Sequence, residues 1–180
     1  MYIREMLPED YPSVSAIYQQ GIETHNATFE TAAPNWEAWN QKHSPFCRLL
    51  AIENDIIIGF AALMPYSSRS VYEGVGVLSI YIHDRFQGRG VGRFLLKNLI
   101  EESEKQGIWM LQAGILPENK ASIALHRKMG FRKVGYREKI AKMNGKWRDI
   151  LLLERRSKIV GRDDEELFKN STSYYEKIRV

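Results

Sequence analysis

The segment Gln87-Gly88-Arg89-Gly90-Val91-Gly92 lies between a β-forming run, 75–82, and the clearest helical pattern of the chain, 90–106. A glycine-rich turn that opens a helix presents several backbone N–H groups to an anion, and the helix dipole adds to the attraction. Glycine also lets the backbone approach a phosphate closely, and three arginines lie in or beside the segment. The segment therefore predicts a pyrophosphate-binding loop.

Two common nucleotide motifs do not fit this loop. A P-loop requires G-x-x-x-x-G-K-[ST], and no window of the chain supplies that lysine and hydroxyl. A dinucleotide fingerprint requires G-x-G-x-x-G, and counting from Gly88 the last glycine position falls on Arg93. At this point a glycine-rich turn without a ligand stays open as an alternative.

The pattern outward from the loop alternates strands and helices. Periodicity and turn residues predict a strand at 2–5, a helix from Pro8, a second helix after Pro34, a hairpin of 48–52 and 56–63, and a loop at 64–74. Further along they predict a strand at 108–115, a short helix from Asn119 to Gly130, and strands at 131–136 and 148–153. This order predicts an α/β (α+β) domain around a mixed sheet.

Length and composition exclude several classes of protein. The 180 residues fit one domain, which we place at 1–156, followed by a C-terminal appendage at 157–180, for which a helix and partial disorder both stay open. The formal net charge of +4 is too small to indicate a nucleic-acid partner. A single cysteine, Cys47, excludes an internal disulfide and a cysteine-based zinc cluster, and we read it as a buried apolar residue. No apolar run approaches the length of a membrane span. We expect a cytoplasmic protein with no metal and no membrane or nucleic-acid partner.

Two motifs resemble the GNAT superfamily of N-acetyltransferases. Gln87, Gly90 and Gly92 match the Q-x-x-G-x-G loop that holds acetyl-CoA in that family, and 119–131 resembles its N-x-x-S-x-x-L-[YH]-x-x-x-G-F segment. The resemblance implies a mostly antiparallel central sheet flanked by helices, with acetyl-CoA as acetyl donor and no metal. It implies cofactor contacts at Ile80, Tyr81, Ile82, Gln87, Gly88, Arg89, Gly90, Val91, Gly92, Arg93, Asn119 and Ser122.

Four further segments, 22–24, 28–31, 65–72 and 145–149, resemble the phosphinothricin acetyltransferase branch, so that the resemblance covers about 2–155. That branch acetylates the free amine of small amino-acid analogues. The resemblance therefore implies an acceptor similar to phosphinothricin or methionine sulfoximine, and a homodimer. The acceptor-binding positions that it implies are Phe29, Glu30, Arg69, Tyr72 and Val77, with Arg69 suited to bidentate capture of a carboxylate.

The helix after Asn119 carries a polar stripe. At 100° per residue, Asn119, Ser122 and His126 fall within about 60° of one another. Acyl transfer to an amine needs a group that accepts the amine proton, donors for the oxyanion, and a proton for the leaving thiolate. The resemblance places His126 near the cofactor sulfur, where it could act as that acid or position the pantetheine. It also implies a catalytic position at Tyr81, whose strand can supply a backbone N–H to the oxyanion. Glu73, at or before the start of that strand, is a further candidate catalytic residue.

One position departs from the branch. Relatives usually carry a glutamate where this chain has Val77, and valine cannot accept a proton. Glu73, Glu23, Glu30 or a chain of water molecules could substitute for it. The departure leaves two alternatives beside a small-molecule N-acetyltransferase. One is an enzyme that acetylates a protein N-terminus or lysine, and the other is a non-catalytic acetyl-CoA-binding module.

Overall fold

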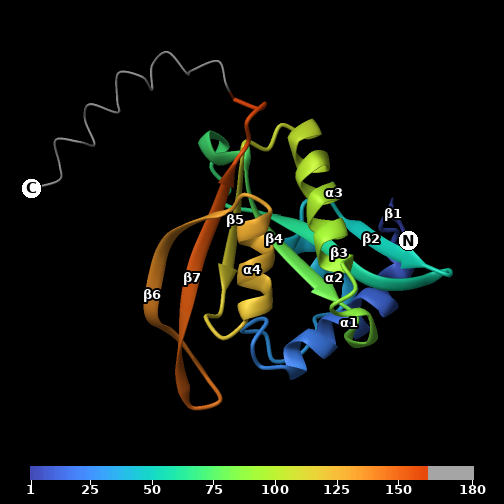
Figure 1. The fold of residues 1–180 in the computed structure, drawn as a ribbon, viewed down its shortest axis with the longest axis horizontal. Coiled ribbons are helices and arrows are strands. Elements are labelled where there is room, and N and C mark those ends of the chain that lie inside the picture. Colours follow the sequence, from blue (N-terminus) through green and yellow to red (C-terminus); the bar gives the residue numbers. More distant parts are fainter. Residues whose placement is uncertain (162–180) are drawn as a thin grey trace, which may run out of the picture.

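In the computed structural model, which describes residues 1–161, a sheet of seven strands forms the centre of the molecule (Figure 1). The strands are β1 (Tyr2–Glu5), β2 (Leu49–Glu53), β3 (Ile56–Pro65), β4 (Val75–Ile82), β5 (Met110–Ile115), β6 (Arg132–Met143) and β7 (Lys146–Arg156). Their order is β1-β2-β3-β4-β5-β7-β6. All neighbouring pairs are antiparallel except β4 and β5. The predicted mixed, mostly antiparallel sheet is confirmed.

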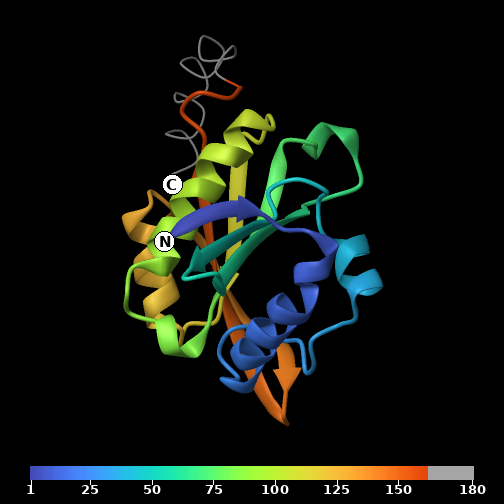
Figure 2. The same ribbon diagram turned by 90° about the vertical axis from the view of Figure 1, so that its right-hand side faces the viewer.

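Within residues 1–161, four α-helices cover the two faces of the sheet. They are α1 (Tyr11–Glu23), α2 (Trp36–Lys42), α3 (Val91–Lys105) and α4 (Lys120–Lys128). Figure 2 shows α1 and α2 on the opposite side of the sheet from α3 and α4. Each layer has its own core. Leu95 and Leu99 of α3 are fully buried against one face of the sheet, and Val14 of α1 and Trp39 of α2 are buried against the other. Burial of such side chains contributes about 1.5–3 kcal/mol each.

The gap between β4 and β5 positions the site. The parallel ladder joins only three residue pairs and ends where Val77 faces Gln112. Beyond that pair, β4 continues to Ile82 and β5 to Ile115, and the two strands diverge. Backbone N–H and C=O groups on the β5-facing edge of β4 are therefore left without a strand partner, and such groups are strong sites for a ligand to bond.

The boundaries differ from the sequence prediction mainly at the C-terminal side. The last two strands are longer than 131–136 and 148–153, because β6 and β7 form one hairpin that continues to the turn at Asn144 and Gly145. The expected loop at 64–74 contains a short 3-10 turn, Ser70–Tyr72. Cys47 is buried, and burial raises the pKa of its thiol to about 12. Most of the predicted appendage, residues 162–180, lies outside the described residues.

Candidate active site

The glycine-rich loop forms an open cradle at the start of α3. Gly88 and Gly90 have φ angles of 74° and 85°, the left-handed region that favours glycine. A Cβ atom built on either residue would meet no other atom within 4 Å. Gly90 is the N-cap of α3, and no side chain caps the first turn. The N–H groups of that turn are therefore free to bind an anion that approaches the loop.

The arginines of the loop lie at its sides. Arg89 donates to Glu53 of β2 at 2.8 Å, and its guanidinium lies 4.9 Å from the ring centre of Phe86. This ion pair holds Arg89 toward the β2–β3 hairpin. Within residues 1–161, Arg85 and Arg93 form no ion pair, so that they provide unpaired positive charge near the loop. Gln87 is exposed beside them.

A cavity of about 660 Å³ connects the β4–β5 gap with the side of the sheet that α1 and α2 cover. Eight of the predicted site residues line it, and they are Phe29, Glu30, Val77, Ile80, Tyr81, Asn119, Ser122 and His126. Three of the five acceptor positions and the polar stripe of α4 thus lie in one continuous space. Ile82 instead packs partly buried against the core, below α3.

His126 is held in a single orientation. Asn119 caps α4 by accepting the N–H of Ser122 at 3.1 Å, and one turn later the imidazole Nδ1 lies 2.8 Å from the Ser122 carbonyl oxygen. A carbonyl only accepts, so Nδ1 carries the proton and Nε2 carries a lone pair. The ring is about 1% exposed and packs edge-on against Phe131. Nε2 has no hydrogen-bond partner among the described residues.

The protonation of His126 follows from this environment. Desolvation by burial lowers its pKa, and the hydrogen bond to the Ser122 carbonyl opposes that shift only in part. The imidazole is therefore neutral at neutral pH, with a buried, unpartnered acceptor nitrogen on a residue that lines the cavity. Burying an unpartnered polar atom costs about 1–3 kcal/mol, and such costs are typical of sites that meet a ligand. His126 is therefore a buried residue and not a solvated surface side chain.

Tyr81 forms part of an aromatic wall. Its ring lies 4.7 Å from that of Tyr18 and 5.3 Å from that of Phe60. Gly21 of α1 allows this approach, because a Cβ there would lie 2.6 Å from the Tyr81 ring. Burial raises the pKa of the Tyr81 hydroxyl, so the phenol remains protonated at neutral pH.

The candidate bases differ in position. Among residues 1–161, Glu30 is the one carboxylate that lines the cavity, and Lys42 pairs with it at 3.2 Å. Glu23 ends α1, and Glu73 is the C-cap of the 3-10 turn; neither lines the cavity. Val77 lines the cavity between Met64 and Gln112, its neighbours on β3 and β5. His126 lines the cavity as well, and its Nε2 has no hydrogen-bond partner among residues 1–161.

The structure does not bring Arg69 and Tyr72 into the cavity. The Arg69 guanidinium lies 5.7 Å from the Tyr72 ring centre, and neither residue lines the cavity. Tyr72 instead packs edge-on against Tyr66, which does line it. Sequence reasoning missed several polar lining residues, namely Lys42, His43, Tyr66, Gln112 and Arg137. Alternation along β5 could have indicated Gln112, and the others depend on tertiary structure.

Arg148 of β7 contacts two segments, one that leads to Phe29 and one that leads to Asn119. Its guanidinium donates to the His25 carbonyl and to Asn26 Oδ1, both at 3.0 Å, and lies 3.4 Å from Glu118. His25 has a φ of 55°, an unfavourable conformation that external contacts must maintain. The residues that Arg148 contacts lead to Phe29 on one side and to Asn119 on the other. Arg148 is thus a positioning residue for both halves of the cavity.

We expect Arg148→Met to raise the KM for the acceptor about tenfold while kcat changes little, because the loop at 24–34 loses its anchor. Charged hydrogen bonds of this type contribute about 1.5–3 kcal/mol. Arg155→Met is the matched control, since Arg155 lies on the same strand, pairs with Glu104 and does not line the cavity. Steady-state kinetics and melting curves separate the two. Equal KM values in both variants would show that Arg148 only stabilises the fold.

Residues 2–131 match the acetyltransferase (GNAT) family, and the chain belongs to that family. Among its relatives, the phosphinothricin N-acetyltransferase of Alcaligenes faecalis is 31% identical over 162 residues, which are 85% of this chain and 81% of the relative. The structure of a ribosomal-protein-alanine N-acetyltransferase from Brucella melitensis superimposes with a TM-score of 0.81 at 30% identity, over 87% of this chain and all of the other. A Salmonella typhimurium protein solved with its cofactor acetyl-CoA has a TM-score of 0.79 at 26% identity, over 87% and 93% of the two chains.

The donor of this family is acetyl-CoA, and the observed residues fit it. The open cradle at Gly88 and Gly90 suits a pyrophosphate, the free edge of β4 suits the amides of pantetheine, and His126 lines the cavity beside that edge. Within residues 1–161, no helix is both long and apolar enough to cross a bilayer.

Proposed function

We propose that this enzyme acetylates the free amine of a small amino acid or amino-acid analogue, of the phosphinothricin or methionine sulfoximine type. The observation that carries the proposal is the buried, unpartnered Nε2 of His126, a residue that lines the cavity joining the β4–β5 gap to Phe29 and Glu30. Relatives that bear amino-acid acetyltransferase names support the class of acceptor.

Different residues of the site have separate roles in the proposed acetyl transfer. When bound, acetyl-CoA supplies the activated acetyl group. The loop from Gln87 to Arg93 binds the pyrophosphate through backbone N–H groups. Backbone N–H groups at Ile80 to Ile82 are positioned to bond pantetheine and the developing oxyanion. His126 accepts the amine proton at Nε2, directly or through water, and the Ser122 carbonyl stabilises the imidazolium that forms.

This assignment differs from both roles that the sequence suggested for His126, a proton donor to the thiolate and a residue that positions the pantetheine. In the tautomer that the Ser122 carbonyl imposes, Nε2 has no proton to donate to a leaving thiolate. His126 must accept a proton before it can give one. A single proton can then move from the attacking amine to the departing sulfur through Nε2, with Tyr81 as an additional hydroxyl on the cavity wall.

Val77 predicts the pH dependence of the reaction. Without a glutamate at this position, the base available to the amine is His126, whose pKa is lowered. Deprotonating the amine costs about 1.4 kcal/mol for each unit by which its pKa exceeds the working pH. We expect kcat/KM to rise with pH through the neutral range, and Val77→Glu to shift that rise to lower pH. The melting curve of the variant must be normal, because an unpaired buried carboxylate destabilises a fold. A flat wild-type profile from weakly acidic to alkaline pH would contradict this expectation.

The experiment that tests the function is a screen for free thiol release from acetyl-CoA with amino acids, their analogues and short peptides. Turnover with small amino acids supports the proposal. Turnover with peptides alone supports acetylation of a protein N-terminus, the activity named for the Brucella melitensis neighbour. Thermal protection by acetyl-CoA without thiol release from any amine would indicate a non-catalytic binding module.

We also propose that the enzyme is a cytoplasmic homodimer. The β6–β7 hairpin supports the dimer, since β6 is the last strand of the sheet and the hairpin exposes Tyr136, Ile140 and Trp147. Light scattering of the purified chain tests the oligomeric state, and cell fractionation tests the location. A monomer at micromolar concentration contradicts the dimer.

A further inference from the structure

The charged side chains that line the cavity include one more positive than negative group. Its charged side chains are Glu30, Lys42 and Arg137, and its two histidines, His43 and His126, both have a pKa lowered by burial. Glu30 and Lys42 neutralise each other at 3.2 Å. Arg137 therefore remains as the single positive charge on the cavity wall that no acidic group of residues 1–161 pairs with.

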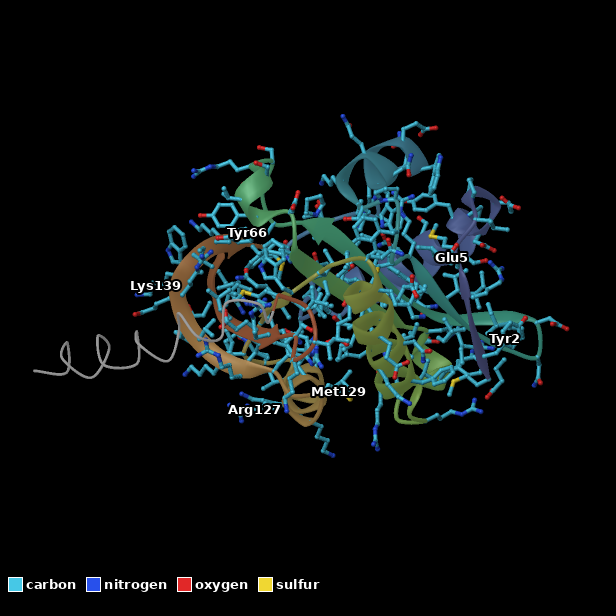
Figure 3. The ribbon with its side chains drawn as sticks, turned by 90° about the horizontal axis from the view of Figure 1, so that it is seen from above. Tyr2, Glu5, Tyr66, Arg127, Met129 and Lys139 are labelled. Carbon is cyan, nitrogen blue, oxygen red and sulfur yellow. The ribbon has the colours of Figure 1, made fainter. Side chains whose placement is uncertain are left out.

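The register of the β6–β7 hairpin directs Arg137 toward the cavity. Arg137 faces Ile150 across the two strands, and paired residues project from the same face of a sheet. Ile150 and Leu152 line the cavity, and Ile150 lies 3.4 Å from the Cβ position of Gly114 on β5. Figure 3 shows this end of the hairpin, marked by Lys139, at the same end of the molecule as Tyr66 and opposite Tyr2.

Asp149, the acidic residue beside Ile150 on β7, already has hydrogen-bond partners. Asp149 projects from the other face of β7, where it accepts the Tyr136 hydroxyl and the backbone N–H of Lys139 at 2.7 Å. Among residues 1–161, Arg137 makes no side-chain hydrogen bond and no ion pair. The strand bulges directly after Arg137, between Arg137 and Ala141, and Lys139 has a φ of 49°. The bulge re-aims the strand at this point.

The geometry points to Arg137 as the residue that binds the carboxylate of the acceptor amino acid. This inference rests on the proposed function and refines it, because Arg69, which the family resemblance favours for this role, does not line the cavity. Guanidinium binds a carboxylate through two parallel hydrogen bonds and so fixes its orientation as well as its charge. With the carboxylate held on the β6 side and the amine near His126, the acceptor spans the cavity beneath the β4–β5 gap.

The test compares each amino acid that the wild-type enzyme acetylates with the amide of the same amino acid, which lacks the charge. Arg137→Gln should raise KM for the amino acid by about 10- to 100-fold, the effect of losing charged hydrogen bonds, and leave KM for the amide nearly unchanged. Arg137→Lys should restore only part of the discrimination, because lysine keeps the charge and loses the fork. Calorimetric titration of the amino acid into enzyme saturated with CoA should show the same order of affinities.

Two variants serve as controls. Arg132→Gln removes another exposed arginine of β6, one that pairs with Glu154 and does not line the cavity, and should leave the ratio of the two KM values unchanged. Arg69→Gln tests the position that the resemblance favours. An unchanged ratio in Arg137→Gln, or the whole effect in Arg69→Gln, overturns the inference while the proposed function stands. Absence of thiol release from the wild type with every amino acid and amide overturns both.

Discussion

Replacing Gly90 with leucine should abolish acetyl-CoA binding while the protein remains folded. Gly90 has a φ of 85° and open space at its Cβ position, directly before the uncapped first turn of α3. A leucine side chain would project into the space where a phosphate must approach the backbone N–H groups. Because several charged hydrogen bonds of about 1.5–3 kcal/mol each would be lost, affinity should fall by at least about 100-fold. Calorimetric titration with CoA measures the change.

Gly107→Leu is the matched control for this experiment. Gly107 follows the other end of α3, has a φ of 78°, and likewise meets no atom within 4 Å of its Cβ position. Both variants therefore carry the same backbone strain of about 1–2 kcal/mol, and their melting temperatures should fall by similar amounts. Only Gly90→Leu should lose CoA. Equal affinities in the two variants would show that the loop does not hold the pyrophosphate.

Much of the fold could be predicted from local patterns. The glycine turn, the apolar stripe of α3 and the alternating strands specify their own structures through periods of 3.6 and 2 residues. The length of the β6–β7 hairpin could not be predicted in this way. Nearly every residue of β6 is exposed, so its pattern lacks the alternation that marks a half-buried strand. The prediction therefore ended the strand at Tyr136, one residue before Arg137.

In the candidate site, too, the features that depend on local sequence could be predicted and those that depend on tertiary contacts could not. The polar stripe on α4 follows from helix geometry alone, and the structure places Asn119, Ser122 and His126 together on the cavity wall. The burial of His126 could not be predicted, because it depends on Phe131 packing against the ring from beyond the helix. The residues around the acceptor depend on the register between strands that are far apart in the sequence. The sequence therefore offered only the family resemblance, which favours Arg69 for binding the acceptor carboxylate, whereas the geometry favours Arg137.

The environment of His126 combines a cost to stability with a chemical role. An imidazole with one nitrogen bonded to a helix carbonyl and the other buried without a partner is less stable than an apolar ring of the same size would be. The Ser122 carbonyl would lose little without it, because the α4 backbone already offers that carbonyl the N–H of residue 126. An apolar residue in place of His126 should therefore lower the catalytic rate without lowering the stability of the fold.

We expect His126→Phe to lower kcat by about 10²–10⁴-fold, the range typical of a lost general base, with an unchanged or higher melting temperature. Phenylalanine keeps a ring against Phe131 and removes the unpartnered nitrogen. His126→Ala is less suitable, because it would leave a cavity beside Phe131 and destabilise the fold.

The pH profile separates a proton acceptor from a residue that only shapes the cavity. The wild-type base must be neutral, and its pKa is lowered from the usual value of 6.5, so below that pH kcat/KM should show an acidic limb that falls more steeply than the free-amine fraction of the acceptor. In His126→Phe that acidic limb should disappear, and the residual rate should follow the free-amine fraction of the acceptor alone. Ser122→Ala, which retains the carbonyl that orients the imidazole, should keep the limb. A His126→Phe variant with wild-type kcat, or with the acidic limb intact, would show that another group accepts the proton.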